Sequence, residues 1–463
     1  MKRPRHQVLQ RPPGRRLHKR SWVRLDNAAN IFIATMDDID TKVFRLGAEL
    51  EEDVDAALLQ TAVDRVYDRY PLYHAVMRRG FFWYYLEDSD LRPVVAPDVL
   101  VPCAHLYHFD RRELLFRVVH HRRRISLEVF HALSDGTGGW WFFRDLLTEY
   151  LRLRHGSGLA AEGPTPGTSL SADSFVDYFG DRAKRFEQAA HAPSGDFEAS
   201  GKPPAKQKMF GSENPGAKVL RVKGTVTPDK RNRIIEVTLP ADQVLALARG
   251  MGASLTVYLV ALYFEAVRRS TPDLARTPRV AVSVPVNLRS QFPSESARNF
   301  FAVTRLEHTY GVGDDSVKAV AASLKEQLLP QLTKQSLQAK VDKLLELEKH
   351  PLGRLVPRVV KDIALNIVNR INNRSLTLAI SGLGKLSLPV DVDDRVRELH
   401  LSVSSPRPQF CVVTHKNWLT IGFTSPFVET DLVAAYTQVL AEQGVPVQAA
   451  PTKVLPRELA VTR

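Results

Sequence analysis

The spacing of apolar positions predicts a chain that mixes strands and helices from end to end. Residues 125–130 alternate apolar and polar side chains, as a half-buried strand does, whereas residues 140–151 repeat large apolar side chains at helical spacing. The same patterns predict further strands at 81–86, 114–119, 233–239, 280–286, 376–380 and, around a tight turn, within 403–424, and helices at 54–70, 174–186, 254–269, 316–346 and 431–443. Strands and helices interleave in both halves of the chain, which indicates an α+β fold.

Residues 156–232 differ in composition from the sequence on either side. Glycine- and proline-rich clusters at 163–167 and 201–204 interrupt polar and charged sequence, as they do in linkers. At 463 residues the chain is also too long for one ordinary core. We therefore divide it into a basic tail (1–21), a first domain (22–160), a linker (161–232) and a second domain (233–463), with no clear sequence repeat between the domains.

The formal net charge of +13 is concentrated near the start of the chain. Residues 1–24 hold nine lysines and arginines and no acid, so the rest of the chain carries a net charge of only +4. Three prolines accompany these cations, and we expect the tail to be disordered and to make at most a weak peripheral contact with an anionic membrane. The sequence has no zinc finger, aromatic RNP motif or basic helix, so no specific nucleic-acid partner is expected.

The composition, with 44% hydrophobic and 25% charged residues, is that of a globular protein. The sequence has no stretch of 18 or more apolar residues, and its start lacks the apolar core of a secretion signal, so a cytoplasmic location is expected. Cys103 and Cys411 fit neither zinc nor redox spacing. We expect both cysteines to be buried thiols, and we expect no metal site.

Residues 130–139, which read FHALSDGTGG, carry the clearest chemical signal in the sequence. They place His131 where a strand gives way to a glycine-rich turn that opens a helix. A side chain in that position can be held rigidly and still reach a cavity, which suits a general base near neutral pH. The alternative is a structural histidine beside a strand, followed by Asp135-Gly136 as an ordinary turn pair.

The segment resembles the HxxxDG active-site motif of the coenzyme A-dependent acyltransferase superfamily. This superfamily includes chloramphenicol acetyltransferase-like enzymes, plant BAHD acyltransferases, nonribosomal peptide condensation domains and bacterial alcohol acetyltransferase-like proteins. The chain looks most like the last group, through RLDNAAN at 24–30, RGFFWYY at 79–85, PVNLR at 285–289, NFF at 299–301 and SGLG at 381–384. The DFGWG motif of the plant enzymes is absent, and the resemblance runs from about residue 22 to 445.

The resemblance implies two chloramphenicol acetyltransferase-like mixed-sheet domains with the active site in a tunnel between them. His131 would be the general base that helps to move an acyl group, expected to be acetyl, from a coenzyme A thioester to an alcohol. Acyl-coenzyme A would be a co-substrate and not a permanently bound cofactor. Asp135 would turn away from the histidine and pair with an arginine of the second domain, for which Arg289 is the candidate. Asp135, Gly136 and Arg289 would then be structural.

Gly138, Gly139 and Asn287 are expected to line the substrate or cofactor tunnel. The glycines would allow a ligand to approach the backbone closely, although a steric need of the strand-to-helix turn explains them equally well. The sequence has no GxSxG motif, so no covalent acyl-enzyme is expected.

Two other functions are compatible with the motif. The first is a condensation-like enzyme that takes its acyl donor from a carrier protein and acylates an alcohol or an amine. The second is a non-catalytic binding module that retains the fold. The intact His131 and Asp135-Gly136 argue against the second, because a binding module needs neither.

Overall fold

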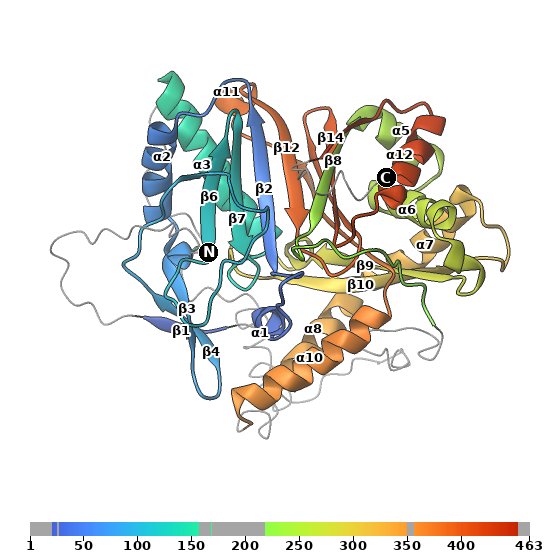
Figure 1. The fold of residues 1–463 in the computed structure, drawn as a ribbon, viewed down its shortest axis with the longest axis horizontal. Helices are drawn as coiled ribbons and strands as arrows, with labels where there is room; N and C mark the ends of the chain where they lie inside the picture. The colour runs from blue at the N-terminus through green and yellow to red at the C-terminus, as the bar shows by residue number, and fades with distance from the viewer. Residues whose placement is uncertain (1–20, 26, 157–167, 169–217, 350–355, 452–463) are drawn as a thin grey trace, which may run out of the picture.

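Two mixed β-sheets, each built mainly from one half of the chain, form the framework of the molecule (Figure 1). The computed structural model describes residues 21–25, 27–156, 168, 218–349 and 356–451. Helices pack beside both sheets, so the molecule is α+β with the two mixed-sheet halves that the sequence predicts. Among these residues no single helix is long and apolar enough to cross a membrane, although α5 (Ala241–Gly250) and α6 (Leu255–Ser270), bent by 86°, meet that test as a pair.

The first sheet carries the HxxxDG segment at the end of its central strand. Its strands are, in order, β12 (Val396–Val403), β2 (Val43–Leu50), β7 (Arg124–Phe130), β6 (Phe116–His121) and β5 (Ala96–Pro97). Only β5 and β6 are parallel neighbours. Two helices, α2 (Ala56–Asp68) and α3 (Gly136–His155), pack together beside this sheet, and a smaller sheet consists of β1 (Trp22–Arg24), β4 (Tyr84–Asp88) and β3 (Ala75–Arg79) (Figure 1).

One strand of the first sheet comes from the second half of the chain. β12 pairs with β2 from Val403, opposite Phe44, to Val396, opposite Leu50. The sequence-based division assigns residues 233–463 to the second domain. β12 therefore crosses that division and belongs to the sheet of the first domain. Without it β2 would be an edge strand with unpaired backbone groups, and the first sheet is complete only with this strand.

The second sheet has seven strands, and a group of helices packs beside it. In order they are β10 (Phe301–Thr309), β9 (Arg279–Asn287), β11 (Leu378–Leu386), β13 (Gln409–His415), β14 (Trp418–Ser425), β8 (Arg233–Pro240) and β15 (Gln448–Pro451). β11 is parallel to both of its neighbours, and the other pairs are antiparallel. Every residue of α6 from Val257 to Val267 is buried, and α6 packs with α7 (Val317–Gln331) and α12 (Asp431–Glu442).

The remaining helices connect these layers. They are α1 (Asn27–Ala34), α8 (Lys334–Lys349), α10 (Arg358–Arg374), α11 (Val390–Asp393) and the short 3₁₀ turns η1 (Pro71–His74), η2 (Pro272–Ala275) and η3 (Leu288–Ser290). α1 packs against α10.

Most elements lie where the apolar spacing predicts them. The strand-turn-helix around His131 is confirmed, as are α6, with Ser254 as its N-cap, and the β13–β14 hairpin. The predicted helical region 316–346 is two helices, α7 and α8. The strand predicted at 81–86 begins only at Tyr84, because the residues before it form the turn after β3. Residues 174–186 lie outside the described residues, and both cysteines are buried free thiols, as predicted.

The elements predicted from the sequence do not include β2, β10, β12 or α10. In β2, which reads VFRLGAEL, Arg45 and Glu49 interrupt the apolar pattern. Arg45 is nevertheless buried, because its guanidinium group pairs with Glu128 of β7 and with Asp98. A charge that is neutralised from a distant part of the chain cannot be told from a solvent-exposed one by local sequence.

Glu128 is a fully buried carboxylate in the middle of β7. Its Oε1 accepts hydrogen bonds from Arg45 Nη1 at 2.9 Å and from the backbone N–H of Cys103 at 2.7 Å, and its Oε2 accepts one from Arg117 Nε. Burial by itself raises the pKa of Glu128, but the two arginines reverse this and hold it below its usual value. The strand that precedes His131 is thus positioned by charges on both of its neighbouring strands.

Replacing Glu128 should destabilise the first sheet. In Glu128→Ala, Arg45 and Arg117 would remain buried without a carboxylate, and we expect unfolding to become easier by about 3–5 kcal/mol. Glu128→Gln is the matched control, since it keeps the packing and the Cys103 hydrogen bond and should cost less. Urea denaturation followed by circular dichroism measures both. Equal stability of Glu128→Ala and the wild type would contradict this role.

Candidate active site

His131 follows the last residue of β7 and is held by elements from both halves. Its backbone N–H donates to the carbonyl oxygen of Lys42 at 2.7 Å, just before the start of β2. Three aromatic rings surround the imidazole: Phe32 of α1 stacks on it with 4.2 Å between ring centroids, and Phe44 and Phe301 lie at 5.4 and 5.7 Å. These contacts leave the ring little freedom to rotate.

Asn299, in the segment between η3 and β10, fixes which ring nitrogen carries the proton. Its Nδ2 donates to the backbone carbonyl oxygen of His131 at 2.9 Å, and its Oδ1 lies 3.1 Å from His131 Nδ1. A backbone carbonyl can only accept a hydrogen bond, so the amide nitrogen must point to it and the amide oxygen to the ring. Nδ1 is therefore the protonated nitrogen, and Nε2 keeps a free lone pair.

The surroundings also keep the imidazole neutral. Burial lowers the pKa of His131 below its usual value. The ring's interaction with its own backbone carbonyl, the charge of Asp135 and the hydrogen bond to Asn299 oppose this shift without reversing it, and Lys42 adds to it. A histidine whose pKa lies below its usual 6.5 or so is uncharged at pH 7, so Nε2 can accept a proton from a bound hydroxyl group.

The carboxylate of Asp135 caps α3 and binds the second half of the molecule. Its Oδ1 accepts a hydrogen bond from the backbone N–H of Gly138 at 2.9 Å. Its Oδ2 accepts one from the backbone N–H of Phe300 at 2.9 Å and one from Arg289 Nη1 at 2.6 Å. The hydrogen-bonding partner of the His131 ring is Asn299, so Asp135 does not orient the imidazole directly.

Arg289 connects Asp135 to the segment that carries Asn299. Its Nη2 donates to the carbonyl oxygens of Ser296 and Arg298 at 2.8 and 2.7 Å. The Asp135 and Arg289 side chains are only 7% and 8% exposed, so they form a buried ion pair across the two halves. The structure thus brings together the two residues that the family resemblance pairs.

Gly138 lies in close contact with the same segment. A Cβ atom on Gly138 would lie 2.1 Å from the carbonyl oxygen of Ala297, which already accepts a hydrogen bond from Ser134 Oγ at 2.6 Å. Backbone atoms cannot move aside as a flexible side chain can, so any larger residue would push the two halves apart. Close packing of the protein alone therefore accounts for this glycine.

The other two motif glycines also face protein atoms. A Cβ atom on Gly139 would lie 2.7 Å from the ring of Phe44, which contacts His131, and one on Gly136 would lie 2.7 Å from the Leu383 side chain of β11. The tunnel role of Gly138 and Gly139 stays a prediction, with the steric explanation sufficient for both.

Asn287 lies at the end of β9 beside the same junction. Its Oδ1 accepts a hydrogen bond from the backbone N–H of Arg289 at 3.0 Å, and its Nδ2 donates to Thr137 Oγ1 of α3 at 3.2 Å. The side chain thus bridges the two halves at an exposed position. A tunnel role for Asn287 also stays a prediction.

Sequence reasoning assigns no role to Asn299 or Phe32, although both contact His131. Asn299 is present in the sequence only as part of the NFF segment that contributes to the resemblance. Phe32 belongs to a short apolar stretch that has no distinguishing pattern. Neither contact has a local signal, because Phe32 and Asn299 both reach His131 from distant parts of the chain.

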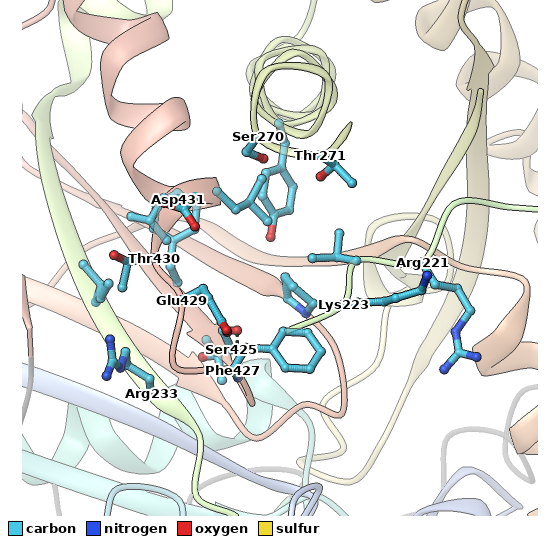
Figure 2. Close-up of a pocket in the computed structure, with 18 of the residues that line it drawn as sticks. Arg221, Lys223, Arg233, Ser270, Thr271, Ser425, Phe427, Glu429, Thr430 and Asp431 are labelled. Atoms are coloured by element: carbon cyan, nitrogen blue, oxygen red, sulfur yellow. Dashed lines mark hydrogen bonds between the residues drawn. The ribbon is translucent and has the colours of Figure 1, made fainter. Parts of the chain in front are cut away.

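A cavity of about 290 Å³ lies within the second half, between the end of α6 and the start of α12 (Figure 2). Its polar lining includes Arg221, Lys223, Arg233, Ser270, Glu429 and Asp431. His131, Asp135 and Arg289 are not among its lining residues. This cavity is therefore distinct from the tunnel that the resemblance implies.

Comparison with known proteins gives a clear answer about the fold. No family model and no curated protein sequence matches the chain. Among solved structures, the first condensation domain of the calcium-dependent antibiotic synthetase is 15% identical, with a TM-score of 0.60, and the match covers 91% of this chain and 96% of that one. The chain has the fold of condensation domains and chloramphenicol acetyltransferase-like proteins.

Two further structures with this condensation-type fold come from Fusarium sporotrichioides. TRI101, complexed with coenzyme A and T-2, is 10% identical with a TM-score of 0.58, and the match covers 93% of this chain and 99% of that one. TRI3, a trichothecene 15-O-acetyltransferase, is 12% identical with a TM-score of 0.56, and the match covers 92% and 95%. Identities this low establish the fold only, so the activity has to be argued from the site.

Double replacement of Asp135 and Arg289 should reveal their coupling. Either Asp135→Ala or Arg289→Met alone leaves one buried charge without its partner, and each should destabilise the protein by about 3–5 kcal/mol. The double variant should lose clearly less than the sum of the two. Urea unfolding of the wild type, the two single variants and the double variant measures the coupling energy. Strictly additive losses of stability would show that the two side chains are not energetically coupled.

Proposed function

We propose that the protein is an acyltransferase that moves an acyl group from coenzyme A to an alcohol, with His131 as the general base. We expect the acyl group to be acetyl. Nε2 removes the hydroxyl proton as the alcohol oxygen attacks the thioester carbonyl carbon. The tetrahedral intermediate then collapses, the carbon–sulfur bond breaks, and the proton passes from Nε2 to the departing thiolate. The products are an ester and the free coenzyme A thiol, and no covalent enzyme intermediate forms.

The single observation that carries this proposal is the orientation of Asn299. Its amide directs the proton of His131 to Nδ1 and leaves Nε2 free, and burial keeps the ring neutral. A base positioned in this way contributes roughly a hundred- to ten-thousandfold to the rate. The buried pair of Asp135 and Arg289 supports the proposal as a positioning device that holds the catalytic segment still.

The proposed donor is acyl-coenzyme A, bound only during turnover. It is supported by the shared fold with a protein solved in complex with coenzyme A and with an O-acetyltransferase. Gly138, Gly139 and Asn287 remain our proposal for residues near the bound substrates. Gly138 and Asn287 contact the opposite half of the molecule, and Gly139 lies against Phe44, which contacts His131.

A donor held by a carrier protein is the second candidate, and the similarity to a condensation domain favours it. The two candidates can be separated directly. The protein is incubated with a panel of alcohols and amines and either acetyl-coenzyme A or an acylated carrier protein, and thiol release is followed in each mixture. Release from acetyl-coenzyme A that depends on an alcohol supports the first candidate, whereas release only from the carrier overturns it.

His131→Ala should lower turnover by about a hundredfold or more and leave folding nearly intact, because only the positioned base is lost. His121→Ala is the matched control, since His121 is exposed at the far end of β6 and should tolerate replacement. Steady-state kinetics with the active donor measures the effect. Wild-type turnover in the His131 variant would exclude the mechanism.

The pH dependence tests the role of Asn299. Since only neutral His131 accepts a proton, and burial lowers its pKa, the acid limb of kcat/KM for the wild type should have its midpoint below about pH 6.5. Asn299→Asp places a carboxylate beside Nδ1, which stabilises the charged ring and should move this limb to higher pH. An unchanged profile in this variant would mean that Asn299 does not act through His131.

A further inference from the structure

α10 exposes an apolar side to solvent. It lies along the lower edge of the molecule in Figure 1, and none of its residues is buried. Six large apolar side chains of this helix are between 50% and 61% exposed: Val359, Val360, Ile363, Ile367, Val368 and Ile371. Their spacing places them on one side of a helix.

The opposite, polar side of α10 faces the protein. Arg358 Nη1 and Asp362 Oδ2 both bond to the hydroxyl group of Tyr84, at 2.8 and 2.9 Å. One turn further on, Asn366 Nδ2 donates to the carbonyl oxygen of Ala34 at the end of α1, at 3.2 Å. A surface helix normally turns its apolar side to the core, so the arrangement here is reversed.

Two exposed aromatic residues lie beside the start of the helix. Phe81 is 73% and Phe82 39% exposed, in the turn between β3 and β4. The turn is fastened to α10, because the Arg358 N–H donates to the carbonyl oxygen of Phe81 at 3.1 Å and Lys361 Nζ to that of Phe82 at 3.3 Å. We call these two residues and the six of α10 the α10 face.

The charged residues of α10 are mostly basic. Within residues 358–374 the single acid is Asp362, which is turned toward Tyr84. Arg370 and Arg374 lie exposed near the end of the helix. A projecting apolar stripe flanked by cations is the arrangement by which amphipathic helices bind the surface of an anionic bilayer.

We propose that the α10 face docks on an anionic membrane surface, with its isoleucines, valines and phenylalanines in the interfacial layer and Arg370 and Arg374 among the lipid phosphates. A single helix at the edge of the molecule is convex and suits a flat bilayer. The proposal does not depend on the acyl-transfer chemistry. It does place the membrane close to the site, because α10 packs on α1 and α1 carries Phe32, which stacks on His131.

The test is co-sedimentation of the full-length chain with vesicles of phosphatidylcholine, with and without about 30% phosphatidylserine. Ile363→Ser with Ile367→Ser should lower the partition coefficient on the anionic vesicles tenfold or more, because two apolar side chains no longer leave water. Val312→Ser with Val390→Ser is the matched control: both residues are exposed, at 75% and 92%, but lie elsewhere, and binding should stay within about twofold of the wild type.

The basic tail is present in every protein compared, so its attraction to anionic lipid cancels. Repeating the measurement at about 0.5 M salt, which screens the tail, should preserve the difference between the two double variants. Equal binding of wild type and Ile363→Ser/Ile367→Ser overturns the proposal, as does a wild type that binds no anionic vesicles. A wild-type dimer that the same variant converts to monomer, without vesicle binding, would instead assign the face to a second copy.

Discussion

A buried carboxylate has to be paired, and in this protein the pairing of Asp135 with Arg289 is made across the junction of the two halves. The same carboxylate caps α3 and accepts the N–H of Phe300, while Arg289 holds the carbonyl oxygens on either side of Ala297. The motif and the facing segment therefore form one unit. The orientation of the imidazole follows from an ion pair to which His131 does not belong.

β7 is tied to the second half at both of its ends. At its first residue, Arg124 Nη1 donates to the two carboxylate oxygens of Glu236 in β8, at 3.0 and 2.8 Å. Just past its last residue, His131 and Asn299 exchange two hydrogen bonds. A side chain fixed in this way loses little freedom when a ligand binds, as in a preorganised site.

The secondary structure around His131 can be predicted from the sequence, whereas the contacts with distant segments cannot. The strand and helix around His131 follow from apolar spacing, the turn between them from its glycines, and the partner of Asp135 from the resemblance. Asn299 gives no signal, because an amide in an aperiodic segment gains its role only when the halves meet. β2 is missed since its buried Arg45 is neutralised from another strand. α10 is missed although its apolar residues recur at helical spacing; only the direction in which its apolar side faces depends on the rest of the fold.

The place of β12 in the first sheet has a consequence for how the protein is made. β7, the strand before His131, lies early in the chain, but the edge of the first sheet is closed by residues that follow β11. During synthesis the first half must therefore wait on the ribosome with β2 uncovered until most of the second half has emerged. An exposed strand edge is a template for pairing with other chains, so the protein is open to aggregation during this interval.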